Sequence, residues 1–443
     1  MSLIIHAIGG YNEIGKNMTL IEIDDEAVVL DMGIHLEKYI AYTEDEDLER
    51  LSASELIKAG AIPDINQIGD LRKKVKAIIP THAHLDHVGA LVFLANKFDA
   101  PIICTQFTKS VLNEMTKDEK VKIKNPIKVL NAGSTVKISD DISVEFVNTT
   151  HSTPQTVMAV IHTKYGPIIY ANDFKFDSYP VFGKKPDFKR LKELGQMGIK
   201  ALIVDCLRVE TEGKTPSENV AKDMLRDVML GTESEGKAMI ATTFSSHLSR
   251  LKSITEFGHQ LNREVIFLGR SLAKYTNAGK DAKIANFSEE VKIVKYAKQV
   301  KRVLKRVERD RGKYLLVVTG HQGEPKSVLS RIVNRELEFN FHSGDHIIFA
   351  SSVIPNLINK SNSDVLEKKL KSMGVRIFRD IHVSGHAGKE DLRDLILMTT
   401  PQHLIPAHGE HKMVSAFSEL AHEMGYQHTK NLHLLRDGQK LNL

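Results

Sequence analysis

The sequence feature that most constrains the fold is the segment 82–87 (HAHLDH), together with the apolar runs on either side of it. The run before it, 75–81, is typical of a buried strand, and the run after it, 88–95, predicts an apolar helix. We therefore interpret the segment as a tight turn from a strand to a helix.

Three imidazoles and a carboxylate within six residues make this turn a candidate site for divalent metals, zinc above all. His82 and His84 alternate along the extended part of the turn and can share one ion. Asp86 and His87 stand at the helix start and point to a neighbouring position, where they can serve a second ion. The alternative is a set of solvated loop histidines, and four ligand-type residues at this spacing argue against it.

Four other apolar runs with strand character lead to a ligand-type residue in the same way. These residues are His151, Asp173, Asp205 and His408. Active sites in α/β folds gather at the carboxyl ends of strands, because the loops converge there while the strands hold them rigid. We therefore expect these distant residues to meet at one place.

This convergence leads to the hypothesis of two metal sites that share Asp173. The first site consists of His82, His84, His151 and Asp173, and the second of Asp86, His87, Asp173 and His408. A bridging carboxylate holds two ions about 3.5–4 Å apart. We interpret Asp31 as an acid that lies behind a metal-bound histidine and fixes its ring orientation. Asp205 either orients a histidine similarly or caps a turn.

Length and composition set the limits within which this site must be placed. A chain of 443 residues is too long for one ordinary core, so we expect two domains. No signal peptide and no apolar run of membrane-spanning length is evident. Cys104 and Cys206 are too few for a disulfide framework, which favours a reducing cytoplasm. The net charge of +5 permits a polyanionic partner without arguing for one.

The middle of the chain has a different pattern from its ends. Helix-like stretches alternate there with short apolar strands, which predicts a parallel sheet with helices on its faces. Because the chain afterwards returns to His386 and His408, we expect this block to be inserted into the first domain. The predicted boundaries are 1–205, 206–354 and 355–443. The acidic run 44–47 is interpreted as a solvated face.

Several loops have the composition of a phosphate site. The Gly-rich turn 381–388 exposes backbone N–H groups beside His386, which could donate a proton to a leaving alkoxide. A tight turn with a chance histidine explains it equally well. Loops 243–247, 269–271 and 320–324 are either phosphate contacts or plain turns. The basic run 292–313 could follow a nucleic-acid backbone, although a solvated helix face is the simpler interpretation.

Taken together, these motifs resemble a known family. The HAHLDH segment, with Asp31, His151 and Asp173 in this order, resembles the metallo-β-lactamase fold. Asp205 and the segments 384–386 (SGH) and 406–410 (PAHGE) resemble the extra motifs of its nucleic-acid-processing branch, the β-CASP proteins.

Within that branch, the segments 319–325 (TGHQGEP), 269–271 (GRS) and 382–386 (HVSGH) are most similar to RNase J. The resemblance extends from Gly9 to His408. It implies an αββα sandwich with an inserted β-CASP domain built on a parallel sheet. The chain ends shortly after His408, as in the shorter archaeal form, so a homodimer would need a surface other than the extra C-terminal domain of bacterial members.

The resemblance also implies roles for individual residues. Zinc ligation falls on His82, His84, Asp86, His87, His151, Asp173 and His408, with manganese or magnesium as substitutes. Catalytic roles fall on His386 as general acid, on Asp205 as its orienting acid and on Asp86. Contacts to the terminal phosphate of RNA fall on Ser384, Gly385, Ala387, Ser245, Ser246 and Arg270.

The activity implied is two-metal hydrolysis of single-stranded RNA, 5′ to 3′ from a 5′ monophosphate, releasing 5′-mononucleotides in RNA decay and maturation. The nearest alternative is an endoribonuclease similar to the archaeal cleavage and polyadenylation type. A DNA repair enzyme is a weaker alternative. A thioester hydrolase of the glyoxalase type would have no use for the inserted domain or for His386. A non-catalytic RNA-binding scaffold would not need intact ligands at every position.

Overall fold

The computed structural model describes residues 2–45, 52–354 and 357–443. The acidic run predicted to be a solvated face, 44–47, lies outside the residues whose side chains are described. The described chain divides into two compact units. The first comprises residues 1–178, 183–215 and 385–443, and the second comprises residues 179–182 and 216–384.

The first unit contains two sheets. The larger has the order β19-β1-β2-β3-β4-β5-β6. Its strands are β1 (Leu3–Gly9), β2 (Met18–Ile23), β3 (Glu26–Leu30), β4 (Val75–Ile79), β5 (Ile102–Cys104), β6 (Ile127–Val129) and β19 (Lys440–Asn442). The second sheet has the order β18-β11-β10-β9-β8-β7. Its strands are β7 (Thr135–Lys137), β8 (Ser143–Asn148), β9 (Val157–His162), β10 (Ile168–Ala171), β11 (Ala201–Asp205) and β18 (His403–Ala407).

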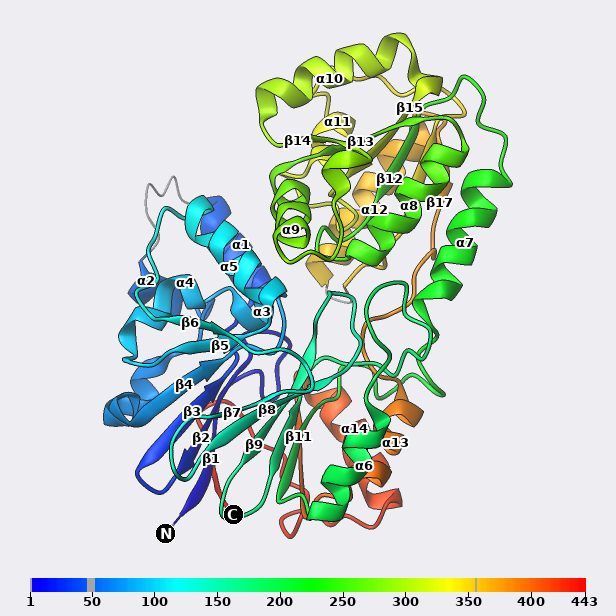
Figure 1. Ribbon diagram of the computed structural model, residues 1–443. Helices are drawn as coiled ribbons and strands as arrows, with labels where there is room; N and C mark the ends of the chain where they lie inside the picture. The colour runs from blue at the N-terminus through cyan, green and yellow to red at the C-terminus, as the bar shows by residue number, and fades with distance from the viewer. Residues whose placement is uncertain (1, 46–51, 355–356) are drawn as a thin grey trace. The chain divides into compact units, whose positions relative to one another are not determined.

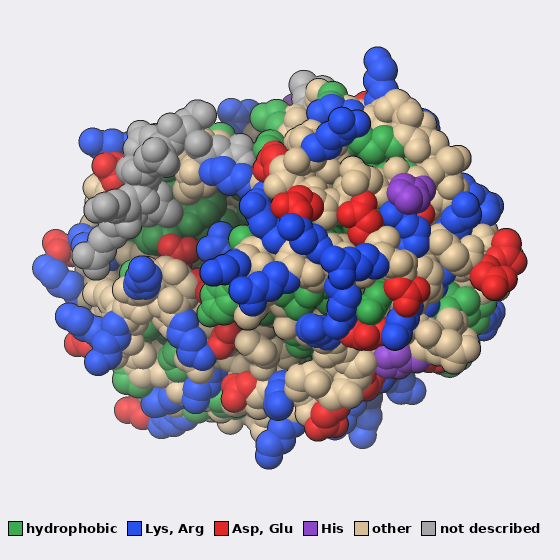
Figure 2. All heavy atoms as spheres, turned by 90° about the horizontal axis from the view of Figure 1, so that it is seen from above, with side chains coloured by type: hydrophobic (Ala, Val, Ile, Leu, Met, Phe, Trp, Pro, Cys, Tyr) green, Lys and Arg blue, Asp and Glu red, His purple; other side chains and the backbone are tan. Residues whose placement is uncertain are grey.

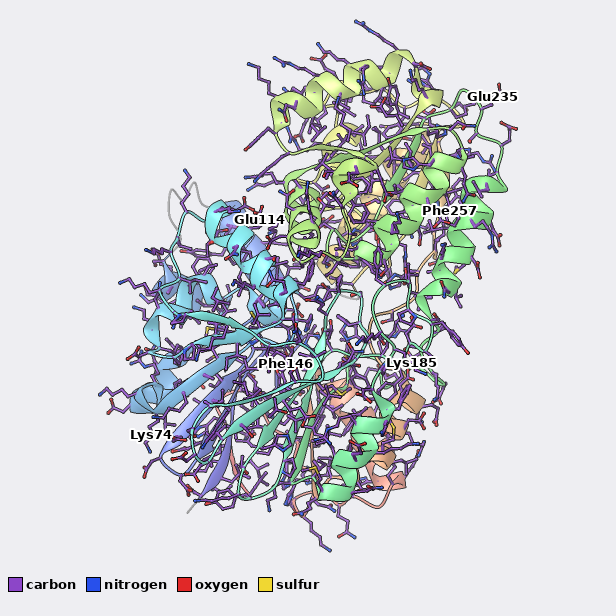
Figure 3. The ribbon with its side chains drawn as sticks, viewed as in Figure 1. Lys74, Glu114, Phe146, Lys185, Glu235 and Phe257 are labelled. Atoms are coloured by element: carbon purple, nitrogen blue, oxygen red, sulfur yellow. The ribbon has the colours of Figure 1, made fainter. Side chains whose placement is uncertain are left out.

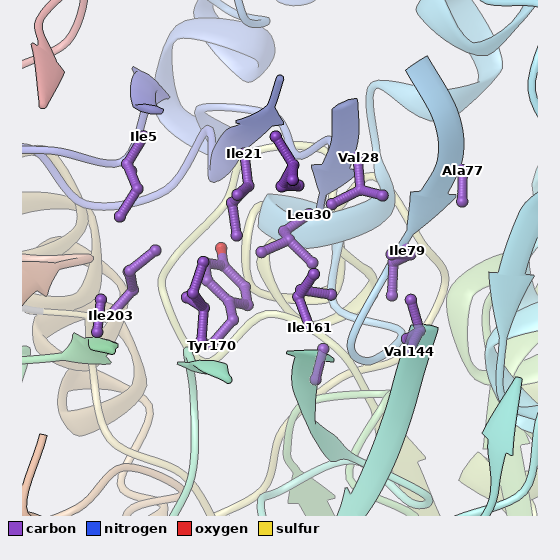
Figure 4. Close-up of a cluster of buried hydrophobic side chains, with 14 of the residues drawn as sticks. Ile5, Ile21, Val28, Leu30, Ala77, Ile79, Val144, Ile161, Tyr170 and Ile203 are labelled. Atoms are coloured by element: carbon purple, nitrogen blue, oxygen red, sulfur yellow. The ribbon is translucent and has the colours of Figure 1, made fainter. Parts of the chain in front are cut away.

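The two sheets of this unit face each other across an apolar core. Figure 4 shows Ile21 and Leu30 of the larger sheet opposite Tyr170 and Ile161 of the second. Alternate residues of each strand point inward, because side chains along a strand alternate between its two faces. The labelled Phe146 in Figure 3 belongs to the same core.

Helices cover the outer faces of both sheets, which completes the predicted αββα sandwich (Figure 1). On the larger sheet they are α1 (Leu36–Asp45), α2 (Ala53–Lys58), α3 (Leu85–Val88), α4 (Leu91–Leu94) and α5 (Gln106–Asp118). On the second sheet they are α6 (Phe188–Met197), α13 (Lys389–Thr399) and α14 (His411–Glu423). Leu191, Leu395 and Phe417 bury the apolar faces of these last three helices.

The second unit is built on one sheet in which every strand pair is parallel, as predicted for the inserted domain. Its strand order is β14-β13-β15-β12-β16-β17. The strands are β12 (Met239–Thr242), β13 (Glu264–Leu268), β14 (Lys292–Val294), β15 (Tyr314–Val318), β16 (His346–Phe349) and β17 (Arg376–Phe378).

Helices lie on both faces of this sheet. They are α7 (Glu218–Leu230), α8 (Leu248–Gln260), α9 (Arg270–Asp281), α10 (Ala297–Arg309), α11 (Val328–Val333) and α12 (Leu357–Ser372). Apolar side chains of α10, α11 and α12 share one core on one face of the sheet, including Leu304, Ile332 and Leu370. A parallel sheet requires such covering, because neither face of it can be left in water.

The structure differs from the sequence-based expectation in two places. The inserted unit comprises residues 179–182 and 216–384 rather than 206–354, and it extends to residue 384 because β17 pairs with β16 and α12 packs on the same sheet. The apolar helix expected over 88–95 is split into α3 and α4, because the Ala90 N–H donates to the Met32 carbonyl at 3.0 Å. Among the described residues, no helix is long and apolar enough to cross a membrane.

Candidate metal centre

The first group of potential ligands forms where β4, β8 and β10 of the first unit end. His82, His84, His151 and Asp173 each offer one donor atom, and these atoms lie within 4.8 Å of one another. The His84 Nδ1 atom lies 3.2 Å from His82 Nε2 and 3.0 Å from His151 Nε2. The Asp173 Oδ2 atom lies 3.5 Å from both Nε2 atoms.

The chemistry of this donor set fits a divalent cation. Burial and the neighbouring imidazole of His151 hold the pKa of His84 well below 6.5, so its ring stays neutral and its lone pair is available. Burial likewise lowers the pKa of His151. The buried Asp173 Oδ1 atom has no hydrogen-bond partner among the described residues. Such an atom is costly unless a further group satisfies it.

The second group shares Asp173 with the first. Asp86, His87, Asp173 and His408 again bring their donor atoms within 4.8 Å. His87 Nε2 lies 3.2 Å from Asp173 Oδ2 and 3.6 Å from Asp86 Oδ2. His408 Nε2 lies 3.7 Å from both Asp86 Oδ2 and Asp173 Oδ1. Burial opposes a charge on His87, but the Asp173 and Asp31 carboxylates raise its pKa well above 6.5. These carboxylates therefore favour a cation at Nε2, which is either a proton or a metal ion that replaces it.

Asp31 lies behind His87, as expected for an orienting acid. Its fully buried carboxylate accepts hydrogen bonds from the Thr81 N–H and from His87 Nδ1, both at 2.7 Å. With its proton held at Nδ1, His87 presents the Nε2 lone pair to the second group. Asp31, Asp173 and His408 all have left-handed backbone conformations, with φ of 56°, 59° and 53°. Strain of this kind concentrates at functional sites.

His386 and Asp205 stand next to the shared carboxylate. His386 Nδ1 lies 2.7 Å from Asp205 Oδ2, and His386 Nε2 lies 3.9 Å from Asp173 Oδ2. Burial lowers the pKa of His386, but Asp205 and Asp173 outweigh burial and raise it to about 9. Asp205 also accepts the Leu207 N–H at 2.7 Å, so it both caps a turn and bonds a histidine.

The residues predicted to hold a phosphate are divided between the two units. Gly385 and Ala387 belong to the first unit, whereas Ser384, Ser245, Ser246 and Arg270 belong to the second. The Gly385 carbonyl accepts a hydrogen bond from His151 Nδ1 at 2.7 Å. A Cβ at Gly385 would lie 2.7 Å from the same nitrogen, so only glycine fits there. The contact of these six residues with phosphate stays a prediction.

Sequence reasoning missed Asn17, which precedes β2. Its side-chain amide lies 2.8 Å from His408 Nδ1 and 3.1 Å from His87 Nε2, and it donates to the Asp86 carbonyl at 3.1 Å. Asn17 therefore contacts all three residues that complete the second group. An asparagine just before a strand gives no signal, because ligand-type residues are recognised by pattern at the carboxyl ends of strands.

Family models match three parts of the chain. The metallo-beta-lactamase superfamily matches residues 11–192, the beta-CASP domain of ribonuclease J matches 236–367, and the Zn-dependent metallo-hydrolase RNA specificity domain matches 373–432. The fold and these matches define a metallo-hydrolase with an inserted β-CASP domain.

Individual relatives narrow this class further. Ribonuclease J of Methanocaldococcus jannaschii is 41% identical over 444 residues, which cover 100% of this chain and 99% of the relative. Ribonuclease J of Pyrococcus abyssi is 43% identical, covering 99% and 97%. The chain belongs to the ribonuclease J family.

Two more distant matches concern the family and the fold, respectively. Ribonuclease J of Sinorhizobium meliloti is 31% identical, over 86% of this chain and 65% of the relative. A crystal structure of a protein of unknown function from Enterococcus faecalis has a TM-score of 0.67 and 17% identity, with both chains fully covered. At that identity, the likeness supports the fold alone.

Proposed function

We propose that this protein is a zinc-dependent ribonuclease that degrades single-stranded RNA from a 5′-monophosphate end, 5′ to 3′, and releases 5′-mononucleotides. The observation that carries the proposal is the pair of ligand groups that share Asp173. His386 adds a proton donor beside them. Ribonuclease activity is also what the names of the full-length relatives state for those proteins.

The donor sets suit two divalent cations, which when bound would activate water and stabilise negative charge on a phosphodiester. His82, His84 and His151 would hold one ion, while Asp86, His87 and His408 would hold the other, and Asp173 would contact both. Asn17, Asp31 and the Gly385 carbonyl orient imidazoles of these two sets through the contacts described above.

His386 would act as the general acid. Against the effect of burial, the Asp205 carboxylate, hydrogen-bonded to Nδ1, raises the pKa of His386 and so favours a protonated ring that can donate a proton to the departing 3′ oxygen. The hydrogen bond to Asp205 holds the proton on Nδ1 and turns Nε2 toward Asp173. Asp205 therefore acts as a positioning residue, and His386 as the residue that touches the reacting atoms.

Cleavage of one RNA in three forms tests the proposal. The RNA is labelled at its 3′ end and supplied with a 5′ monophosphate, with a 5′ triphosphate or as a circle. We expect progressive shortening of the monophosphate form, dependent on metal, and an intact circle. Discrete fragments from all three forms would identify an endonuclease and contradict the proposal. The zinc content of the purified protein, measured by mass spectrometry, tests the identity of the metal.

Two variants separate metal binding from proton donation. His84→Ala removes a ligand of the first group, so we expect loss of cleavage together with loss of bound metal. Asp205→Asn leaves both ligand groups intact, so we expect slower cleavage with unchanged metal content. A fully active His84→Ala variant would contradict the mechanism, and a loss of metal in Asp205→Asn would contradict the role given to Asp205.

A further inference from the structure

Helix α10 of the second unit presents a strip of basic side chains that the proposed metal centre does not use. The members of this α10 basic strip are Lys298, Lys301, Arg302, Lys305 and Arg309, and all five are exposed. At 3.6 residues per turn they fall on one face of the helix and extend over about 16 Å. Figure 2 shows Lys and Arg side chains gathered on this side of the second unit.

The opposite face of α10 fixes the orientation of the strip. Val300, Val303, Leu304 and Val307 are buried in the core of the second unit. Because these residues lie half a turn from the basic ones, the helix cannot roll to bury its charges. The strip is therefore a permanent feature of the surface of this unit.

The charges of the strip are poorly neutralised by the protein itself. Only Lys305 has an ion-pair partner, Glu338 at 2.6 Å, among the strip residues and the described residues around them. Glu308 is the only acid of α10, and it accepts a hydrogen bond from the Asn340 N–H at 3.0 Å. Basic residues four positions apart repel each other and destabilise a helix. An external polyanion would relieve this repulsion.

An exposed aromatic ring stands at the start of the strip. Tyr296, which precedes α10, is 61% exposed, and the Lys295 ammonium lies 5.9 Å from its ring centre. Surfaces that bind single-stranded nucleic acid combine a row of cations with aromatic rings on which bases stack. A nucleic-acid base can stack on such a ring, whereas a carboxylate or a phosphate group cannot.

We propose that the α10 basic strip and Tyr296 form a second RNA-binding surface, which holds the backbone of single-stranded RNA without sequence preference. The choice of RNA as the polyanion rests on the proposed function. The surface lies on the second unit, whereas both ligand groups lie on the first. It therefore adds binding energy for long RNA that does not depend on the metal ligands.

The neighbouring cleft adds little to this surface, although Arg309 belongs to both. A cleft of about 1020 Å³ lies at the carboxyl end of α10 and is lined by Arg309 and Lys313, but also by Glu233, Glu235 and Asp310. Figure 3 labels Glu235 at this edge of the unit. Because these charges are of both signs, a phosphate backbone would gain little by entering the cleft.

The test compares RNA binding by the metal-loaded full chain and by two variants with equal loss of charge. The first variant carries K298Q, K301Q, R302Q and R309Q, and the control carries K58Q, K120Q, K128Q and K192Q at exposed lysines of the first unit. The probe is a cleavage-resistant 2′-O-methyl RNA of 30 nucleotides. Fluorescence anisotropy gives its dissociation constant between 50 and 300 mM KCl.

For the strip variant, we expect the slope of log affinity against log salt to fall by about 3, at about 0.7 per lost phosphate contact. The affinity at 150 mM KCl should fall at least tenfold. Tyr296→Ala should weaken binding while leaving the salt slope unchanged, because stacking releases no counterions. An unchanged slope in the strip variant, or an equal fall in the control variant, would overturn the proposal.

Two further measurements keep the alternatives distinct. Loss of binding to phosphatidylserine vesicles in the strip variant, with RNA binding intact, would assign the strip to a membrane surface and overturn the proposal. Cleavage of a six-nucleotide RNA by the unmodified protein is measured in the same series. Its absence would contradict the proposed nuclease function and leave the binding result to decide on the strip.

Discussion

Replacing Asp31 by Asn tests whether the acid behind His87 controls the second metal group. The carboxylate accepts the proton of His87 Nδ1 at 2.7 Å and so leaves the Nε2 lone pair facing Asp86 and Asp173. An asparagine amide in the same place would donate to Nδ1. The ring proton would then move to Nε2, where it would occupy the position of the metal.

The expected size of the effect follows from this change of tautomer. Loss of such an orienting partner typically costs 10–100-fold in metal affinity, or about 1.4–2.7 kcal/mol. Asparagine is the suitable substitution because residue 31 has a φ of 56°, and Asn tolerates the left-handed region better than most residues. The Thr81 N–H can still donate to the side-chain oxygen, so the fold around residue 31 should persist.

The assay is a titration of metal-free protein with zinc in competition with a coloured chelator. We expect one of the two equivalents to weaken in Asp31→Asn, while the other stays close to its original affinity. Glu22→Gln is a matched control, because Glu22 bonds His6 at 2.9 Å on β1 and β2 and belongs to neither ligand group. Two equivalents bound as tightly as by the unmodified protein would refute the role assigned to Asp31.

Three further predictions concern stability. Arg250→Met should destabilise the protein by about 3–5 kcal/mol in denaturant titrations, because it leaves the buried Glu218 carboxylate without its bidentate partner; a loss below 1 kcal/mol would contradict this. Burial raises the pKa of Glu145, but His162 and Arg190 lower it to about 2. The contribution of Glu145 to the free energy of unfolding is therefore complete above about pH 4.5 and is lost as the pH falls toward 2. We expect about 2 kcal/mol of this contribution to be lost between pH 6 and pH 3, and an equally steep acid profile in Glu145→Gln would refute it. Removing a metal present at 100 times its dissociation constant should lower the free energy of unfolding by about 2.7 kcal/mol, and with it the melting temperature. An unchanged melting curve after chelation would show that the ligand groups hold no metal.

The sequence by itself determined those parts of the protein that depend on local pattern. The turn at 82–87 follows a buried strand and precedes a helix, so the ligand-type residues could be recognised without any distant contact. His151, Asp173 and His408 were found because each stands beyond the end of an apolar strand. The parallel sheet of the inserted domain followed from the alternation of helices and strands. These signals have periods of two to four residues, which a single sequence displays directly.

The tertiary structure determined the features that depend on which segments of the chain lie next to each other. Asn17 reaches His408 because the backbone of the loop before β2 binds the segment around residue 408, a contact between positions 391 residues apart. The Gly385 carbonyl orients His151 across 234 residues, and the boundary at residue 384 depends on the pairing of β17 with β16. A residue's own type does not reveal its partner when that partner is brought close only by folding. The sequence therefore indicated the ligands, and the fold supplied the groups that hold them in place.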